Sequence, residues 1–379
     1  MKKYRSIIIK SIIIVLLVAT LIVLIVLKNN PDIAEAFMRG PARVYALVAS
    51  KVSSAIPFIS LTELLFISLG AVAILFIVLF ILDLVKKQVV KGIGKVLNIA
   101  LIAVAVITAY QFSCEAAYNR KEMPLPYYQN DVERTEYASI YNFFASDLGE
   151  CLAATEFTEK GNVKNAMSFN NMVKEVKKAY QIVNDPYFHS STGSVKKLLS
   201  SFIYREFQLT GVTFSPLGEA NINTLNVTVD IPYTIAHEIA HTKGVMREDD
   251  ANILAFYVCL NSDNPFLRLS AYNRRFNLIA NMGSGTYLTK EEIAGLVKPD
   301  LSNYYKSNSF QYNYWNKEHN LLKNVGDFFN NLSLKSSGVS EGTSSYSNNT
   351  EEVYDPTEHR LSYYNLYHKL FFEKYYRCI

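Results

Sequence analysis

The chain has 379 residues, of which 50% are hydrophobic and 19% are charged, and its formal net charge is +4. This length suggests two domains, or one domain with additional segments. The net charge is small and the crowded basic residues lie beside apolar runs, which argues against nucleic-acid binding.

Three apolar runs precede residue 113, and they cover residues 11–27, 64–82 and 96–112. Each approaches the ~20 residues that a spanning helix needs. We therefore expect a transmembrane segment over residues 1–112, with spans at about 7–27, 62–84 and 94–112. The first run is too long for the core of a cleaved signal peptide, which favours an uncleaved anchor. A buried helix of a soluble domain is the alternative for the third run.

Lysine and arginine side chains predict the orientation of these spans. They crowd the short N-terminus and the short loop between the second and third runs, and they are sparse in the longer first loop. Since basic loops stay in the cytoplasm, we expect a multi-pass protein of the cell membrane whose C-terminal domain, residues 113–379, is extracytoplasmic. Residues 34–56 of the first loop carry apolar residues at helical spacing, which predicts either an interfacial helix or a helix packed on the outer domain.

The remaining 267 residues, 113–379, are enough for one sizeable core. Apolar periodicity predicts helices over residues 132–157, 164–183, 194–207, 266–281 and 361–376. Apolar and polar residues alternate over residues 225–229, which predicts a strand. A strand in this region would offer an open sheet edge to which an extended peptide adds; the alternative for Glu219, Asn221 and Asn223 is turn chemistry. Residues 335–352 are rich in Ser, Gly, Asn and Thr and predict a flexible loop.

The most specific pattern is His237-Glu238-Ile239-Ala240-His241, which reads His-Glu-x-x-His. On a helix, residues i and i+4 lie on one face, so His237 and His241 can bind one Zn²⁺. Glu238 lies one step round the helix, where it can act as general base on zinc-activated water without being a ligand. The apolar flanking residues favour a buried site, because buried polar groups need partners. The alternatives are a satisfied core or surface helix, or a degenerate site.

Three acidic residues compete to be the third ligand: Glu248, Asp249 and Asp250. Gly244 predicts the end of the first helix, and a second helix is expected over residues 248–260. Glu248 lies on the side of small residues that would pack against the first helix, whereas Asp249 is rotated by ~100° and Asp250 by ~200°. This favours Glu248, with Asp250 as the main alternative.

The four cysteines are Cys114, Cys151, Cys259 and Cys378, and no Cys-x-x-Cys occurs. A cysteine zinc site is therefore not expected. Two disulfides are permitted outside the cytoplasm, and buried thiols are the alternative.

Glu248-x-x-Ala251-Asn252 resembles the Glu-x-x-Ala-Asp element that follows His-Glu-x-x-His in gluzincin metallopeptidases. In that family the Glu is the third zinc ligand and the Asp orients a ligand histidine. Here Asn252 replaces the Asp, and the segment between His241 and Glu248 is short. The whole chain also resembles a family of uncharacterised bacterial membrane proteins with a gluzincin-like domain, through Ile56-Pro57-Phe58, Asn119-Arg120 and Gly218-Glu219-Ala220-Asn221.

The expected fold is mainly α with a small β element: a three-helix transmembrane segment followed by a gluzincin-like α+β zinc domain. The resemblance implies a membrane-anchored zinc metallopeptidase that hydrolyses peptide bonds of a peptide or protein substrate outside the cytoplasm. The alternative is an inactive, zinc-stabilised sensor or scaffold that binds a peptide or envelope partner. The expected residues are the ligands His237, His241 and Glu248, the base Glu238, and Asn252 beside a ligand histidine. Tyr233, Tyr257 and Tyr272 are unranked candidates for stabilising an oxyanion.

Overall fold

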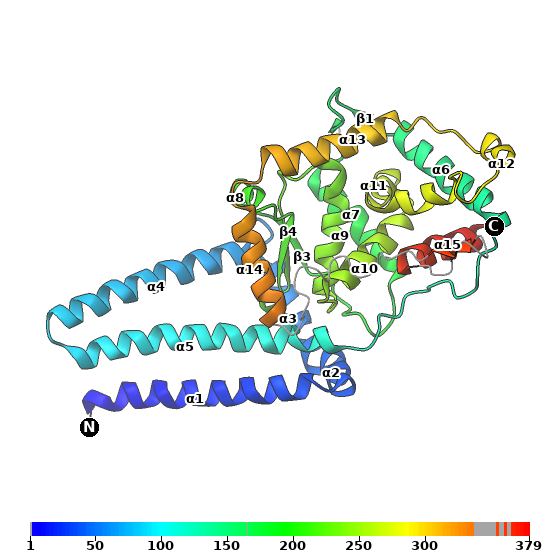
Figure 1. Ribbon diagram of the computed structural model, residues 1–379. Helices are drawn as coiled ribbons and strands as arrows, with labels where there is room; N and C mark the ends of the chain where they lie inside the picture. Colours follow the sequence, from blue (N-terminus) through cyan, green and yellow to red (C-terminus); the bar gives the residue numbers. More distant parts are fainter. Residues whose placement is uncertain (1, 165, 337–353, 356–359, 362–364) are drawn as a thin grey trace.

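The computed structural model describes residues 2–164, 166–336, 354–355, 360–361 and 365–379. Over these residues the protein is mainly helical, with three small β-sheets (Figure 1). A bundle of long helices extends from one end of a larger, globular helical body (Figure 1). The expected mainly helical fold with a small β element is therefore confirmed.

The bundle consists of α1 (Lys2–Lys28), α4 (Leu61–Val85) and α5 (Val89–Cys114). Each is long and apolar enough to cross a membrane, and almost none of their apolar surface is buried within the protein. α5 packs against both α1 and α4. The third run is therefore not a buried helix of a soluble core, and all three helices are compatible with membrane insertion.

The loop after α1 is helical and packs on the globular body. It forms α2 (Pro31–Phe37), a π-helical turn η1 (Met38–Ala42) and α3 (Arg43–Ser54). Ser50 and Ser53 of α3 are buried on the body, whereas Val44, Val48 and Val52 are exposed on the other side. The alternative of a helix packed on the body is therefore confirmed for α3, while an interfacial position of its exposed apolar face stays a prediction.

The central sheet has the strand order β3-β5-β4, with β3 (Ser194–Lys197), β4 (Gly211–Phe214) and β5 (Glu219–Ile222). β3 runs parallel to β5 and β4 runs antiparallel to it. α9 (Ile231–Thr242) covers one face of this sheet, and α3 and the start of α4 cover the other. The sheet therefore joins the membrane helices to α9, which carries the His-Glu-x-x-His motif.

Two predictions for this region are wrong. The predicted helix over 194–207 is strand β3 followed by the short helix α8 (Ser201–Glu206), because residues 194–197 pair with β5. The predicted strand over 225–229 is a turn that leads into η6 (Thr228–Asp230). The side-chain oxygens of Asn223 and Asn226 accept the backbone N–H groups of Leu225 and Val227, at 3.0 and 2.7 Å, and so replace strand pairing.

Helices α6 (Tyr137–Ala153), α7 (Phe169–Ala179), α10 (Glu248–Leu260), α11 (Pro265–Met282) and α15 (Leu366–Cys378) share one apolar core with α9. α7 begins later than expected because Ser168 caps it, after the short strand β2.

Most of the predicted loop 335–352 lies outside the described residues; Lys335 and Ser336 end α14. The remaining elements are η2 (Glu115–Asn119), η3 (Arg134–Glu136), β1 (Glu156–Phe157), β2 (Val163–Lys164), η4 (Tyr180–Ile182), η5 (Ser215–Leu217), α12 (Lys290–Ala294), α13 (Ser302–Asn313), η7 (Tyr314–Glu318), α14 (Lys323–Ser336), β6 (Tyr354–Asp355) and β7 (Arg360–Leu361).

The start of α4 is bound to the sheet by a buried carboxylate. Glu219 of β5 accepts hydrogen bonds from the backbone N–H groups of Leu61 and Thr62 at 3.2 and 3.3 Å, and from Lys196 Nζ at 2.7 Å. The first N–H groups of a helix have no partner within it, so Glu219 satisfies the start of α4. All four cysteines are free thiols, and only Cys378 is exposed.

Candidate metal centre

Residues at and beside both ends of α9 fix where this helix begins and ends. Pro232 lies in its first turn, where the missing N–H costs nothing. Asp230, just before the helix, is buried and accepts hydrogen bonds from Asn273 Nδ2 at 3.0 Å and pairs with Arg274 at 3.1 Å, both on α11. Gly244 ends the turn after α9 with a φ of +83°, a conformation that favours glycine.

The two histidines of the motif and Glu248 converge on one point. The Nε2 atoms of His237 and His241 are 3.1 Å apart. Glu248 Oε2 lies 3.1 Å from His237 Nε2 and 3.7 Å from His241 Nε2. Within the described residues these three form a group of potential metal ligands whose donor atoms all lie within 4.8 Å of one another.

The hydrogen bonding of His241 directs a lone pair into this group. Its Nδ1 lies 2.8 Å from the backbone oxygen of Val245. Because a carbonyl can only accept, Nδ1 carries the hydrogen and Nε2 of the neutral ring is unprotonated. The Nδ1 of His237 is buried and has no hydrogen-bond partner among the described residues. The backbone of the turn after α9 thus supplies the orienting contact for one of the two rings.

The spacing and chemistry of these donors fit Zn²⁺. A tetrahedral ion with bonds of 2.0–2.1 Å to nitrogen and oxygen holds its ligand atoms about 3.3 Å apart. The three observed separations are 3.1, 3.1 and 3.7 Å. Two histidine nitrogens and one carboxylate oxygen are also the ligand types of many zinc sites that keep an open position.

The competing carboxylates point elsewhere. Asp249 Oδ2 pairs with Arg247 at 3.0 Å, and Asp250 Oδ2 lies 3.6 Å from the same guanidinium group. α10 packs directly on α9, and its Ala251 and Ala255 are fully buried. This close approach brings Glu248, the first residue of α10, to the histidines.

Asn252 lines a cavity that is also lined by His237 and His241, but within the described residues it is not hydrogen-bonded to either ring. Its backbone oxygen accepts a hydrogen bond from the Tyr233 hydroxyl at 2.7 Å, and its side chain lines the cavity. Its expected role beside a ligand histidine stays a prediction.

Glu238 is buried next to the ligand group. Its Oε2 accepts a hydrogen bond from Thr213 Oγ1 of β4 at 2.7 Å. Gly211 of the same strand leaves room for the carboxyl, since a Cβ there would lie 2.5 Å from Glu238 Oε1. Burial raises the pKa of Glu238 to about 7, with His241 and the Thr213 hydrogen bond lowering it in part and Glu248 raising it. A carboxyl with a pKa near neutral can both accept and donate a proton.

These residues line a cavity of about 930 Å³ between α9, β4 and the ends of the membrane helices. Tyr110 of α5 and Tyr118 of η2 line it, and no local sequence signal identified either residue. Gly211 and Thr213 were also missed, although a glycine within a strand often marks a close approach. Tyr233 lines the cavity, whereas Tyr257 and Tyr272 do not appear in its lining. The Tyr272 hydroxyl instead donates to Asp147 at 2.5 Å.

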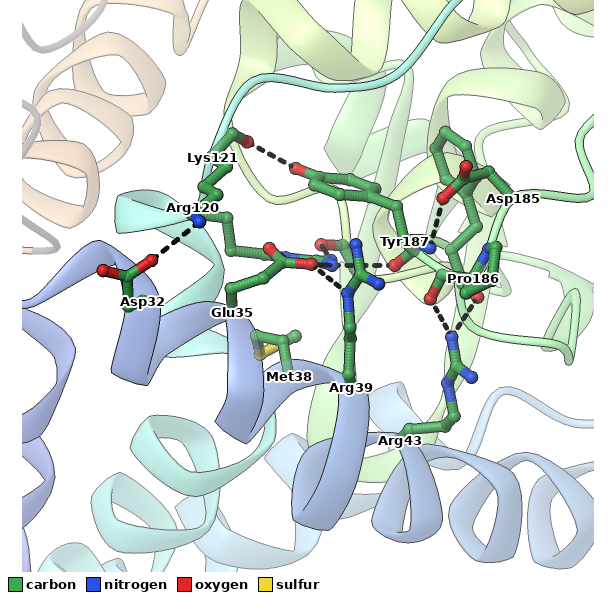
Figure 2. A network of polar contacts seen from close by, with 12 residues as sticks. Asp32, Glu35, Met38, Arg39, Arg43, Arg120, Lys121, Asp185, Pro186 and Tyr187 are labelled. Carbon is green, nitrogen blue, oxygen red and sulfur yellow. Dashed lines mark hydrogen bonds and ion pairs between the residues drawn. The ribbon is translucent and has the colours of Figure 1, made fainter.

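A polar network joins Glu35 of the first loop to Arg120 and Tyr187 (Figure 2), and Arg120 also contacts the turn between α9 and α10. Arg120 donates from Nη1 to the Gly244 oxygen at 3.1 Å and from Nη2 to the Tyr187 oxygen at 2.8 Å. Glu35 of α2 receives two further hydrogen bonds from Arg120, both at 2.9 Å. Hydrogen bonds from Arg120 and Arg39 lower the pKa of Glu35, although burial opposes them. Glu35 of the first loop is therefore linked through Arg120 to the backbone oxygen of Gly244, the residue before Val245.

Comparison with known proteins identifies one family. Residues 37–353 match the model of a family described as "Protein of unknown function (DUF3810)". The match includes α4, α5 and every residue of the candidate metal centre. No curated protein and no solved structure matches the chain.

Proposed function

Since the chain belongs to the DUF3810 family, whose description assigns no activity, we propose a function from the site itself: a membrane-anchored zinc metallopeptidase with a gluzincin-like domain. The observation that carries the proposal is the convergence of His237, His241 and Glu248 in one cavity with the buried carboxyl of Glu238. A cation bound there, and the water that it activates, would lie beside a carboxyl that can act as base, as metal-assisted hydrolysis requires.

His237, His241 and Glu248 would hold the ion through two nitrogens and one oxygen. Bound Zn²⁺ supplies Lewis-acid chemistry, which polarises a carbonyl group and makes water a better nucleophile at neutral pH. The Val245 carbonyl keeps His241 in the tautomer whose Nε2 can coordinate.

Glu238 performs the proton transfers. Its carboxylate accepts the proton of the attacking water and then donates it to the nitrogen of the leaving amine. Thr213 holds the carboxyl by one hydrogen bond, and Gly211 provides the space that it occupies. Burial of the carboxyl raises its pKa and so favours the protonated form, from which a proton can be donated to the leaving amine.

The edge of the sheet supports a polypeptide substrate. β4 pairs only with β5 among the described strands, so its other edge is unpaired. Gly211, Val212 and Thr213 of this strand line the cavity beside Glu238. An extended peptide can add to such an edge by main-chain hydrogen bonds, which would lay a peptide bond across the site.

The proposed location is the extracytoplasmic face of the cell membrane. This follows from the basic residues that crowd the N-terminus and the loop between α4 and α5. The substrate is then a peptide or protein outside the cytoplasm.

The test is Glu238→Gln, compared with the wild-type protein for zinc content and for cleavage of a peptide library. We expect zinc to remain bound, because no ligand is removed, and cleavage to fall by about 10²–10⁴-fold. Glu291→Gln, on the exposed helix α12, is the matched control and should change neither. If the wild-type protein and Glu238→Gln bound zinc equally and the wild type cleaved no peptide, a zinc-stabilised sensor or scaffold would be favoured instead.

A further inference from the structure

The cavity lies at the level where the membrane helices meet the globular body. Phe214, the last residue of β4, packs edge-on against Phe66 of α4, with ring centroids 5.1 Å apart. It also stacks on Tyr110 of α5 at 6.4 Å. Tyr110 in turn lines the cavity. One wall of the candidate site is therefore continuous with the apolar helices.

α8 is held at this same level by the start of α4. The carboxylate of Glu63 accepts the backbone N–H groups of Leu199 and Ser200, at 2.6 and 2.9 Å. Glu63 is in the first turn of α4, whose apolar surface continues toward the other end of the bundle. Leu199 and Phe202 are exposed, although they are large and apolar.

α14 adds a second exposed apolar face. Leu321, Val325, Phe328 and Leu332 recur every three or four residues and are between 45% and 80% exposed. Gly326 and Leu334 on the opposite side line the cavity. The Leu322 N–H donates to the Glu206 oxygen of α8 at 3.0 Å, which fastens α14 to α8. Figure 1 shows α14 running across the domain ends of α4 and α5 instead of along them.

We propose that six exposed apolar residues, which lie in α8 and α14 or just before them, form a collar in the lipid surface next to the globular body, and that the cavity receives polypeptides held at that surface. The collar consists of Leu199, Phe202, Leu321, Val325, Phe328 and Leu332. Amphipathic helices beside membrane spans bury their apolar face among the lipid headgroups and upper acyl chains. Lipid is the occupant because Leu199 is hydrogen-bonded to Glu63 at the start of α4, whose apolar surface is not buried, and α14 is joined to α8 by the Leu322–Glu206 hydrogen bond.

The collar faces lipid on one side and the cavity on the other. α14 presents Phe328 outward and Gly326 inward within one turn. A polypeptide anchored in the same membrane therefore reaches the cavity without leaving the surface, whereas a soluble peptide must find it from bulk water. This second part rests on the proposed function; the lipid contact does not.

The lipid contact is tested on the full-length protein in lipid nanodiscs, with Cys378→Ser to remove the exposed thiol. A fluorophore on Phe328→Cys should be quenched by lipids with a spin label high on the acyl chain, and poorly quenched by iodide. The matched controls are Asp327→Cys on the other side of α14 and Lys290→Cys on α12, which should show the reverse. Iodide quenching of the Phe328→Cys label equal to that of the controls would overturn the collar.

The substrate class is tested with one peptide in two forms, free and joined to a lipid anchor, given to the same nanodiscs. The anchored form should be cleaved at least about tenfold faster, because tethering raises its effective concentration at the cavity. A collar variant, Phe328→Ser with Val325→Ser, should reduce this ratio. Equal rates for both forms in the wild type would overturn surface delivery. No cleavage of either form would instead count against the proposed peptidase, and the quenching result would still decide the collar.

Discussion

At the scale of single residues, Glu238 is held by neighbours that carry no charge. Thr213 donates one hydrogen bond to its carboxyl, and Gly211 contributes only the absence of a side chain. Both belong to β4, so the strand that would bind substrate also positions the base. Small changes in that strand should therefore alter proton transfer more than metal binding.

The Gly211→Ala change tests this arrangement. The added methyl group would lie 2.5 Å from Glu238 Oε1 and must displace the carboxyl. We expect kcat to fall about 10- to 100-fold, the effect of misplacing a catalytic group by an ångström or less, while zinc content stays at the wild-type value. Gly285→Ala is the control, because the nearest atom to its new Cβ is 3.7 Å away. An unchanged kcat in Gly211→Ala would show that the carboxyl position is not critical.

The third ligand is the other prediction at this scale. Glu248→Ala should lose stoichiometric zinc and lower the melting temperature of the protein, since metal binding contributes to folding stability. Asp249→Ala and Asp250→Ala should retain zinc, because both carboxylates pair with Arg247. The measurement is metal content of the three purified variants. If Asp250→Ala lost zinc and Glu248→Ala retained it, the third ligand would be Asp250 and our assignment of Glu248 would be wrong.

At the scale of elements, the turn between α9 and α10 connects the two parts of the metal site. It carries the Val245 carbonyl that orients His241, and it reverses the chain so that Glu248 returns to the histidines. Arg120 contacts this turn through the Gly244 oxygen and stacks on the Tyr187 ring, 3.6 Å from its centroid. The loop between α1 and α4 thus supports the metal site through a buried ion pair with Glu35.

Arg120→Ala should therefore weaken zinc binding without removing a ligand. Contacts that orient ligands are worth about 10- to 100-fold in metal affinity, and we expect a loss in that range, measured by competition with a chelator. The neighbouring Lys121→Ala is the matched control, because Lys121 pairs with Asp32 on the exposed surface (Figure 2). Equal zinc affinities in the two variants would show that the network only stabilises the fold.

At the scale of the whole molecule, the candidate metal centre and the three long apolar helices belong to one connected structure. Glu219 satisfies the start of α4, and Glu63 of α4 satisfies the start of α8. The sheet lies between α9 and the membrane-side helices. If α1, α4 and α5 cross a membrane, the cavity lies close to it, on whichever side the globular body lies.

That side is predicted by the basic residues. An enzyme reporter that is active only outside the cytoplasm should be active when it is fused after Ile379. The same reporter fused after Lys87, between α4 and α5, should be silent, because that loop is rich in lysine and is expected in the cytoplasm. Activity after Lys87 with silence after Ile379 would place the metal site in the cytoplasm.

The sequence by itself determined those features that depend on residues close together in the chain. The lengths of the apolar runs predicted α1, α4 and α5. The helical spacing of His237 and His241 placed two imidazoles on one face, and the rotation of residues 248–250 about their helix favoured Glu248. Gly244 predicted the left-handed turn. Each is a consequence of helix geometry over a few turns.

The tertiary structure alone decided which distant segments meet. Residues 194–197 became a strand only because β5 lies beside them, and strand pairing overrides local helical spacing. Gly211 and Thr213 joined Glu238, and Tyr110 joined the cavity, through contacts between elements far apart in sequence. The carbonyl of Val245 that orients His241 belongs to the backbone, and because every residue has such a carbonyl, the sequence does not indicate this contact. These contacts form because packing buries apolar surface and satisfies buried polar groups across the whole molecule, which no short window of sequence contains.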